Sequence, residues 1–197
     1  QVTMPVMTVK EVPLTVEFVE TPGSRLENVK WKLTPVDTIT LSGDASTMAS
    51  IKEIKLDTLA LADLKAAETF TYEIPIPKNV ENLSGVTSVT LTILFDDIDS
   101  LTMDATQFGY ENLSTKREVT VVTSTLSVTL RGTSAALAQV TDENLHVVAD
   151  LSDVSDADGT YTVPARVYVD DLDVGASGSY QLTVRLSEGA GSSTQQG

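Results

Sequence analysis

The sequence predicts a mainly β protein of two tandem modules, each made of short strands with one short helix after a strand–glycine turn. An internal repeat is the first reason: residues 39–43 (ITLSG) are matched by residues 128–132 (VTLRG), 89 positions later. Residues 88–93 and 179–184 match again at an offset of 91. Because the matches keep their order and nearly their spacing, the 197 residues are expected to form two domains, each large enough for its own core.

Alternation of apolar and polar side chains is the second reason. In residues 180–186 (YQLTVRL) every other residue is apolar, which is typical of a strand with one buried face. The same alternation predicts strands at residues 14–18, 86–95, 118–123 and 126–130. Turn-forming clusters interrupt these runs at residues 22–24, 78–79, 158–159 and 175–178. Many short strands separated by turns favour a mainly β fold.

One short helix is expected in each repeat, directly after the glycine that ends the first matched strand. Residues 44–51 and 133–140 begin with Asp or Thr, which cap helix N-termini. Apolar pairs at i and i+3 give each helix one apolar face: Met48 with Ile51, and Leu137 with Val140. We expect Gly43 and Gly132 to supply a positive φ at the turn into the helix. A second helix is possible over residues 59–67, which are rich in Ala, Leu and Lys but have no counterpart in the second repeat.

The repeat also sets the domain boundaries. The first module is expected at residues 10–100 and the second at residues 105–187, with a short linker near residues 101–107. Residues 188–197 are rich in Gly, Ser and Gln, so they are expected to form a flexible tail.

Composition excludes several classes of function. With 28 acidic and 13 basic residues the chain has a net charge of −15, which opposes binding to nucleic acid and to anionic lipid. The absence of cysteine excludes disulfides, thiolate catalysis and zinc–thiolate sites. No apolar run approaches the roughly 18 residues that cross a bilayer. Since the chain starts at Gln1 without an initiator Met, we expect an ectodomain whose targeting segment was removed.

His146 is the sole histidine and the first candidate for catalysis. It lies in a strand-like stretch with no nucleophile-elbow sequence nearby. A surface imidazole is therefore favoured over a Ser-His-Asp relay. No catalytic or cofactor-binding residue is assigned.

Three acidic segments are candidate metal sites. Residues 153–160 (DVSDADGT) resemble a calcium loop, but Val154 and Ala165 fall at ligand positions, which favours a polar hairpin turn. The runs at residues 96–99 and 170–173 are interpreted as sheet ends whose charges discourage edge-to-edge pairing. No metal ligand is assigned.

Trp31 and two glycosylation sequons are the last candidate sites. Trp31, flanked by lysines, could form a sugar-stacking face with Phe18, Phe70 and Tyr72, although a single Trp is more often a core or rim residue. Asn82-Leu83-Ser84 and Asn112-Leu113-Ser114 would be glycosylated only in a eukaryotic secretory route, so they are interpreted as chance matches.

The order of these segments resembles the YbbR-like repeat family. In that family a strand of the form β-Thr-β-x-Gly precedes a short helix, a Val/Leu-Asp-Leu stretch and a strand resembling Ile-Pro-x-Pro. The resemblance covers most of residues 10–187. It rests on the order and spacing of these segments, which occur in both repeats. Residues 39–43 and 128–132 match the first strand, and residues 56–59 and 149–152 match the Asp stretch. Residues 74–77 and 163–165 match the Pro strand. Residues 12–16 and 110–113, near the start of each module, also fit the family pattern.

The resemblance implies a non-enzymatic, extracytoplasmic module without catalytic residues or cofactors. Family members commonly carry an N-terminal membrane helix before several repeats, and CdaR-like members regulate a membrane diadenylate cyclase and hence cyclic-di-AMP. We therefore expect a regulatory interaction module of a bacterial envelope protein, at the cell surface and membrane-anchored in its full-length form. Its expected partner is a membrane protein. There are three alternatives. The first is a glycan-binding module, which would require an exposed Trp31. The second is a structural stalk, and the third is a hydrolase that uses His146.

Overall fold

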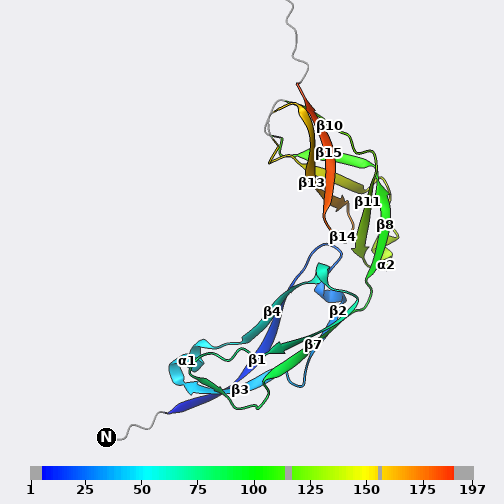
Figure 1. The fold of residues 1–197 in the computed structure, drawn as a ribbon. Helices are drawn as coiled ribbons and strands as arrows, with labels where there is room; N and C mark the ends of the chain where they lie inside the picture. Colours follow the sequence, from blue (N-terminus) through cyan, green and yellow to red (C-terminus); the bar gives the residue numbers. More distant parts are fainter. Residues whose placement is uncertain (1–5, 114–116, 155–156, 189–197) are drawn as a thin grey trace, which may run out of the picture. The chain divides into compact units, whose positions relative to one another are not determined.

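The computed structural model describes residues 6–113, 117–154 and 157–188 of the chain. The polypeptide forms two compact units (Figure 1). The first unit holds the chain up to Thr21 together with Arg25–Asp96, and the second holds Pro22–Ser24 together with the chain from Asp97 onward. Strands dominate both units and each contains one short α-helix, so the predicted mainly β class with two repeats is confirmed.

A four-stranded sheet in the first unit has the order β4-β1-β3-β6. Its strands are β1 (Met7–Val19), β3 (Thr38–Asp44), β4 (Ile54–Ala60) and β6 (Val80–Asn82). β1 changes partner along its length: up to Pro13 it runs antiparallel to β3, and from Leu14 it runs parallel to β4. The register with β4 shifts between Thr15 and Val16. One long strand therefore joins an antiparallel and a parallel ladder.

A three-stranded sheet completes the first unit in the order β2-β7-β5. Its strands are β2 (Val29–Thr34), β7 (Ser88–Phe95) and β5 (Ala67–Glu73), and β7 lies in the middle. Side chains alternate along β7: Leu91 and Ile93 are buried, while Thr92 and Leu94 are exposed. Buried residues of both sheets form the core, so the polar positions of β7 lie on an outer face.

The second unit repeats these elements. One sheet has the order β14-β11-β8, formed by β14 (Val174–Ser177), β11 (Leu126–Gly132) and β8 (Asp99–Ala105). The other has the order β10-β15-β13-β12-β9, formed by β10 (Glu118–Val121), β15 (Tyr180–Ser187), β13 (Gly159–Val169), β12 (Leu145–Asp150) and β9 (Gln107–Glu111). Leu130, Val147 and Val184 are among the fully buried side chains of its core.

Two strands of the second unit share the role that β1 has in the first. β8 is antiparallel to β11 and β9 is parallel to β12, just as the two halves of β1 pair with β3 and β4. The second unit also pairs β12 with β13, which joins five strands in one sheet. Among the described residues no corresponding ladder links β4 to β5.

The two predicted helices are present as α1 (Ala45–Ser50) and α2 (Ser134–Leu137). The Asp44 carboxylate caps α1 by accepting from the N–H groups of Ser46 and Thr47. The hydroxyls of Ser46 and then Thr47 also donate to Asp44 and hold the pKa of that carboxyl well below its usual range. Thr133 caps α2 by accepting from the Ala136 N–H at 3.2 Å. Within the described ranges no helix is long and apolar enough to cross a bilayer.

The glycines before the helices are needed for space and not for a positive φ. Neither Gly43 nor Gly132 has a positive φ, so the predicted reason was wrong. A Cβ at Gly43 would lie 3.2 Å from the Met48 Sδ, and a Cβ at Gly132 would lie 3.2 Å from the Asp173 carbonyl oxygen. Close packing where the strand meets its neighbours therefore selects glycine at this point of both repeats.

We expect Gly43→Val to lower the free energy of unfolding of the first unit by about 1–3 kcal/mol, because a branched side chain overpacks this site. Gly43→Ala should cost less, since a single methyl requires the end of Met48 and the Asn79 carbonyl, 3.3 Å from the added Cβ, to move by only a few tenths of an ångström. Urea unfolding followed by circular dichroism measures both variants. Equal stability of the valine variant and the parent chain would contradict the packing argument.

The additional helix considered at residues 59–67 is absent, and that prediction was wrong. β4 continues to Ala60, a single 3-10 turn follows at Leu61–Asp63, and β5 begins at Ala67. Leu61 and Leu64 are both buried, which the tight turn achieves within four residues. Burial of two leucines therefore overrides the helical propensity of the segment.

Two predicted connections are also strands. Residues 175–178 were expected to be a turn, but Val174–Ser177 is β14, which pairs antiparallel with β11. The expected linker near residues 101–107 contains most of β8, which pairs with β11, and the start of β9. The chain divides after Asp96 because β8 takes its ladder partner from the second unit. Another short 3-10 turn, Leu26–Asn28, precedes β2.

Candidate functional site

His146 lies on β12 and is paired with a carboxylate. Its Nε2 is 2.9 Å from an Asp170 carboxylate oxygen, and the imidazole is partly exposed. Asp170 directly follows β13, whose antiparallel register places Tyr168 opposite His146. Within the described part of the chain no serine, threonine or cysteine side chain is hydrogen-bonded to the ring. The arrangement is a hydrogen-bonded pair at the surface, and among the described residues it does not contain the nucleophile that a Ser-His-Asp relay requires.

The acidic segments have local partners. Asp96 pairs with Lys30, with 2.7 Å between the Lys30 Nζ and a carboxylate oxygen. Asp97 accepts from the N–H and the hydroxyl of Ser134 at the start of α2. In the segment considered as a calcium loop, Asp158 pairs with Arg117, whereas residues 155 and 156 lie outside the described residues. No group of three or more potential metal ligands occurs among the described residues.

The sequon asparagines have structural hydrogen bonds. The Asn82 amide donates to the Val86 carbonyl at 2.7 Å, and its carbonyl accepts from the N–H and hydroxyl of Ser84. The Asn112 amide donates to Asp150 at 3.0 Å, while residue 114 lies outside the described residues. Asn112 also has a positive φ of 59°, which asparagine tolerates better than most residues.

A charged and aromatic face lies on the five-stranded sheet of the second unit. Cross-strand register aligns His146 with Tyr168 and aligns Val148 with Arg166. The Arg166 guanidinium lies 3.6 Å from Glu111 and 3.8 Å from Asp150. Hydrogen bonding by Asn112 and Ser152, with a smaller contribution from Arg166, lowers the pKa of Asp150. We call this surface, made of Glu111, His146, Val148, Asp150, Arg166 and Tyr168, the Tyr168 face.

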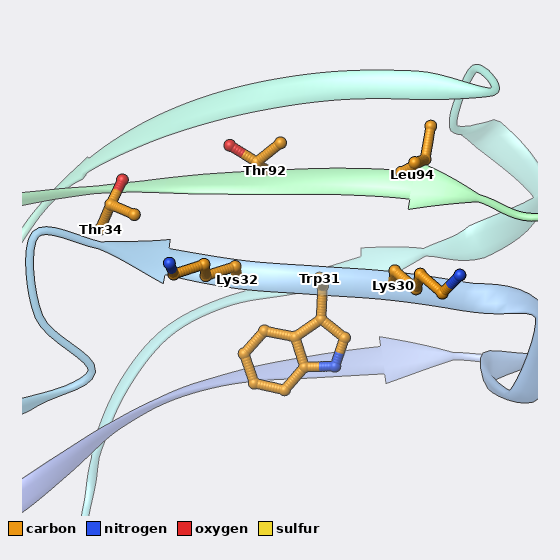
Figure 2. Close-up of a pocket in the computed structure, with 6 residues that line it drawn as sticks. All are labelled: Lys30, Trp31, Lys32, Thr34, Thr92 and Leu94. Atoms are coloured by element: carbon orange, nitrogen blue, oxygen red, sulfur yellow. The ribbon is translucent and has the colours of Figure 1, made fainter.

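The first unit carries an open surface pocket of about 290 Å³ over β2 and β7, shown in Figure 2. Lys30, Lys32 and Thr34 of β2 lie opposite Leu94, Thr92 and Thr90 of β7 in the sheet register. Residues of these two rows and Trp31 line the pocket: Lys30, Trp31, Lys32, Thr34, Thr92 and Leu94. We call it the Trp31 pocket.

Trp31 forms one edge of this pocket. Its indole projects from β2 on the side away from β7, and the two lysine side chains lie along β2 on either side of it (Figure 2). The indole packs against Phe18 with ring centroids 5.6 Å apart, yet 43% of the residue is exposed. Phe70 instead stacks on Tyr72, so the four aromatics considered together form two separate pairs.

Sequence reasoning identified Trp31 and the lysines that flank it but missed Thr34, Thr92 and Leu94. Alternation along each strand could have indicated that Thr92 and Leu94 face outward. Which residues of β2 lie beside them depends on the cross-strand register, and about sixty residues separate the two strands in sequence. No local pattern encodes that register.

The sequence matches the family described as YbbR-like protein over residues 12–93 and again over residues 110–187. These two matches cover most of the chain, and each lies within one of the two repeats. The chain therefore belongs to the YbbR-like family and carries two copies of its domain. No curated protein matches the sequence.

Solved structures similar to the chain include three from Streptococcus and Listeria. SuR18C from Streptococcus thermophilus aligns with 48% of this chain and 89% of its own, at 15% identity and a TM-score of 0.37. A YbbR-like protein from Streptococcus pneumoniae TIGR4 aligns over 95% and 98%, at 10% identity and a TM-score of 0.34. The YbbR-like domain of the lmo2119 protein from Listeria monocytogenes aligns over 46% and 94%, at 26% identity and a TM-score of 0.32. The family assignment rests on the sequence matches to the two repeats.

Proposed function

We propose that the two modules are a non-enzymatic interaction unit of a bacterial envelope protein, located outside the cytoplasm, which regulates a membrane diadenylate cyclase through protein contacts. The observation that supports the proposal is the match of both repeats to the YbbR-like family. The regulatory role is what the resemblance to CdaR-like members of that family implies. In the proposal, another part of the full-length protein supplies the membrane anchor. Changed contact with the cyclase then changes cyclic-di-AMP output.

The Tyr168 face is the contact surface favoured by this proposal. Tyr168 is 42% exposed, and Tyr and Arg are the residue types that most often dominate protein interfaces. The Arg166 guanidinium lies 3.6 Å from Glu111 and 3.8 Å from Asp150, so two carboxylates attract it toward this part of the sheet. An ordered sheet face loses little side-chain entropy on binding, which favours a specific contact.

The test is cyclic-di-AMP output when the full-length parent protein is co-expressed with the membrane diadenylate cyclase of its host. We expect output to change when residues 10–187 are deleted and the rest of the protein is retained. Unchanged output after this deletion, with the shortened protein present in the membrane at the parent level, would reject the regulatory role of the modules.

A point variant then tests the contact surface. Tyr168→Ala should reproduce at least part of the effect of the deletion, since truncating a central interface residue typically weakens binding by about 1–2 kcal/mol or more. The matched control is Tyr110→Ala, because Tyr110 is 48% exposed but lies opposite Ala149 on the other side of its sheet. If the deletion has an effect and both tyrosine variants behave like the parent, the contact lies elsewhere on the modules.

A further inference from the structure

Gly109 is a glycine that the fold of the second unit does not require. It lies in the middle of β9, the edge strand of the five-stranded sheet. Its φ is not positive, and among the described residues an added Cβ would meet only a Val148 methyl, at an ordinary contact distance of 3.8 Å. Gly43 and Gly132 differ, because atoms of their neighbours would lie 3.2 Å from such a Cβ. Glycine weakens a strand through its conformational entropy and its lack of a side chain, so Gly109 is unfavourable for the fold alone.

The first repeat shows that a side chain fits at the same position. The repeat matches Asp57 of β4 with Asp150 of β12. In the first unit, Thr15 of β1 lies opposite the residue two positions before Asp57. In the second unit, Gly109 lies opposite the residue two positions before Asp150. Threonine therefore holds the position of Gly109 in the first unit, and the same fold accepts a branched side chain there.

Gly109 adjoins the Tyr168 face. The ladder of β9 with β12 places Gly109 beside Val148, and the ladder of β12 with β13 places Val148 beside Arg166. Residues opposite one another in a ladder share one side of the sheet, so Gly109 leaves a gap there between Gln107 and Glu111. The register of β9 with β12 is regular, which excludes a bulge as the reason for the glycine. The remaining use of a strand glycine is to let another backbone approach closely.

Charge indicates what kind of segment suits this surface. Glu111 and Asp150 both lie near the Arg166 guanidinium, which compensates part of their charge. Asp170 adjoins the face through its 2.9 Å contact with His146, which carries a charge only when it is protonated. The Asp170 side chain is 61% exposed, and within the described part of the chain it has no ion pair with Lys or Arg. Asp170 therefore attracts a basic side chain from a partner.

We propose that the Tyr168 face binds an extended segment of the partner protein, whose main chain passes over Gly109 and whose basic side chain pairs with Asp170. Strand spacings of about 4.8 Å and a rise of about 3.3 Å per residue place these two points roughly 16 Å apart, which roughly five extended residues span. The exposed ring of Tyr168 lies two residues before Asp170 and packs on the same segment. The inference rests on the proposed function, which supplies the membrane diadenylate cyclase as the partner.

Gly109→Thr, which copies the residue of the first repeat, separates binding from folding. We expect the Tm of the 197-residue chain to stay equal or to rise, because threonine favours a strand more than glycine does. In the full-length parent protein, the same variant should retain about fivefold less co-expressed diadenylate cyclase when the two are co-purified from solubilised membranes. Thr162→Leu is the matched control, because it adds bulk at an exposed position of β13 that pairs with β15, outside the Tyr168 face.

Asp170→Asn tests the basic side chain of the partner. It should lower the retained cyclase by up to about fivefold and make retention less sensitive to salt, since an exposed charge pair is removed. Asp104→Asn is the matched control, because Asp104 is an exposed carboxylate on β8, which belongs to the other sheet of the second unit. It should leave both retention and its salt dependence at the parent level.

The outcomes distinguish this inference from the proposed function. If deletion of residues 10–187 abolishes retention of the cyclase but Gly109→Thr or Asp170→Asn retains it like the parent, the inference is overturned and the proposed function stands. A lower Tm for Gly109→Thr also overturns the inference, because the fold would then need the glycine. If the deletion leaves retention and cyclic-di-AMP output unchanged, the proposed function fails, and this inference fails with it.

Discussion

Val147→Asp is expected to unfold the second module at neutral pH. Val147 is fully buried on β12, between β9 and β13, where water cannot reach the carboxylate. An unpaired buried charge costs several kcal/mol even after relaxation, which is comparable with the total stability of roughly 5–15 kcal/mol for a small domain. Loss of the second unit's amide signals in a two-dimensional NMR spectrum, with those of the first unit retained, is the expected result.

The adjacent residue provides the control for this prediction. Val148 is only partly buried and lies opposite Arg166, on the Tyr168 face. Val148→Asp adds the same charge one position further along β12, but on the solvent side and near a guanidinium. We expect it to stay folded within about 1 kcal/mol of the parent, because exposed charge pairs contribute little either way. Equal damage by both variants would show that the alternation assigned to β12 is wrong.

Leu130→Ala is expected to lower the free energy of unfolding of the second unit by about 3 kcal/mol. Leu130 is completely buried in β11, and removing such a side chain costs its transfer free energy together with that of the cavity left behind. For a domain of this size the loss corresponds to a fall in Tm of more than about 10 °C. Scanning calorimetry of the intact chain measures it.

The matching residue of the first repeat makes this a test of independence. Leu41 is likewise completely buried, in β3, so Leu41→Ala should cost a similar amount in the first unit. Hydrogen exchange followed by mass spectrometry reports the two units separately. We expect each variant to raise exchange only in its own unit, since each has its own sheets and core. Loss of protection in both units from either variant would contradict two separate folding units.

The fold class could be predicted because the relevant signals are local and occur twice. Alternation in residues 180–186 predicted β15, and the cap followed by an apolar pair predicted α1 and α2. The switch of β1 from an antiparallel to a parallel partner could not be predicted, because residues 7–19 carry no mark of which strands flank them. The strand β14 was mistaken for a turn because Gly175 and Ser177, with Gly178 directly after the strand, have low β propensity, which a ladder with β11 overrides.

The candidate site was only partly predictable for the same reason. Trp31 could be singled out because it is the one tryptophan of the sequence and lies between two lysines. Its contact with Phe18 depends on how the two sheets pack, and the place of Thr92 and Leu94 beside β2 depends on strand register. His146 was correctly placed on a strand surface, whereas its partner Asp170 is 24 positions away and meets it only through the hairpin of β12 and β13. Pairings across strands require the topology, and the sequence of one strand does not contain it.

The central place of β7 has a consequence for a chain emerging from the ribosome. β2 and β5 both pair with β7, which is the last strand of its unit to be synthesised, and β15 has the same position between β10 and β13. Until Ser88–Phe95 has been translated, the strands that flank it have no neighbour and leave unpaired edges open to other nascent chains. Pairings such as Val29 with Phe95 also close long loops, which slows folding. Each repeat therefore completes its fold only after its final strand is released, and until then its unpaired strand edges can associate with other chains.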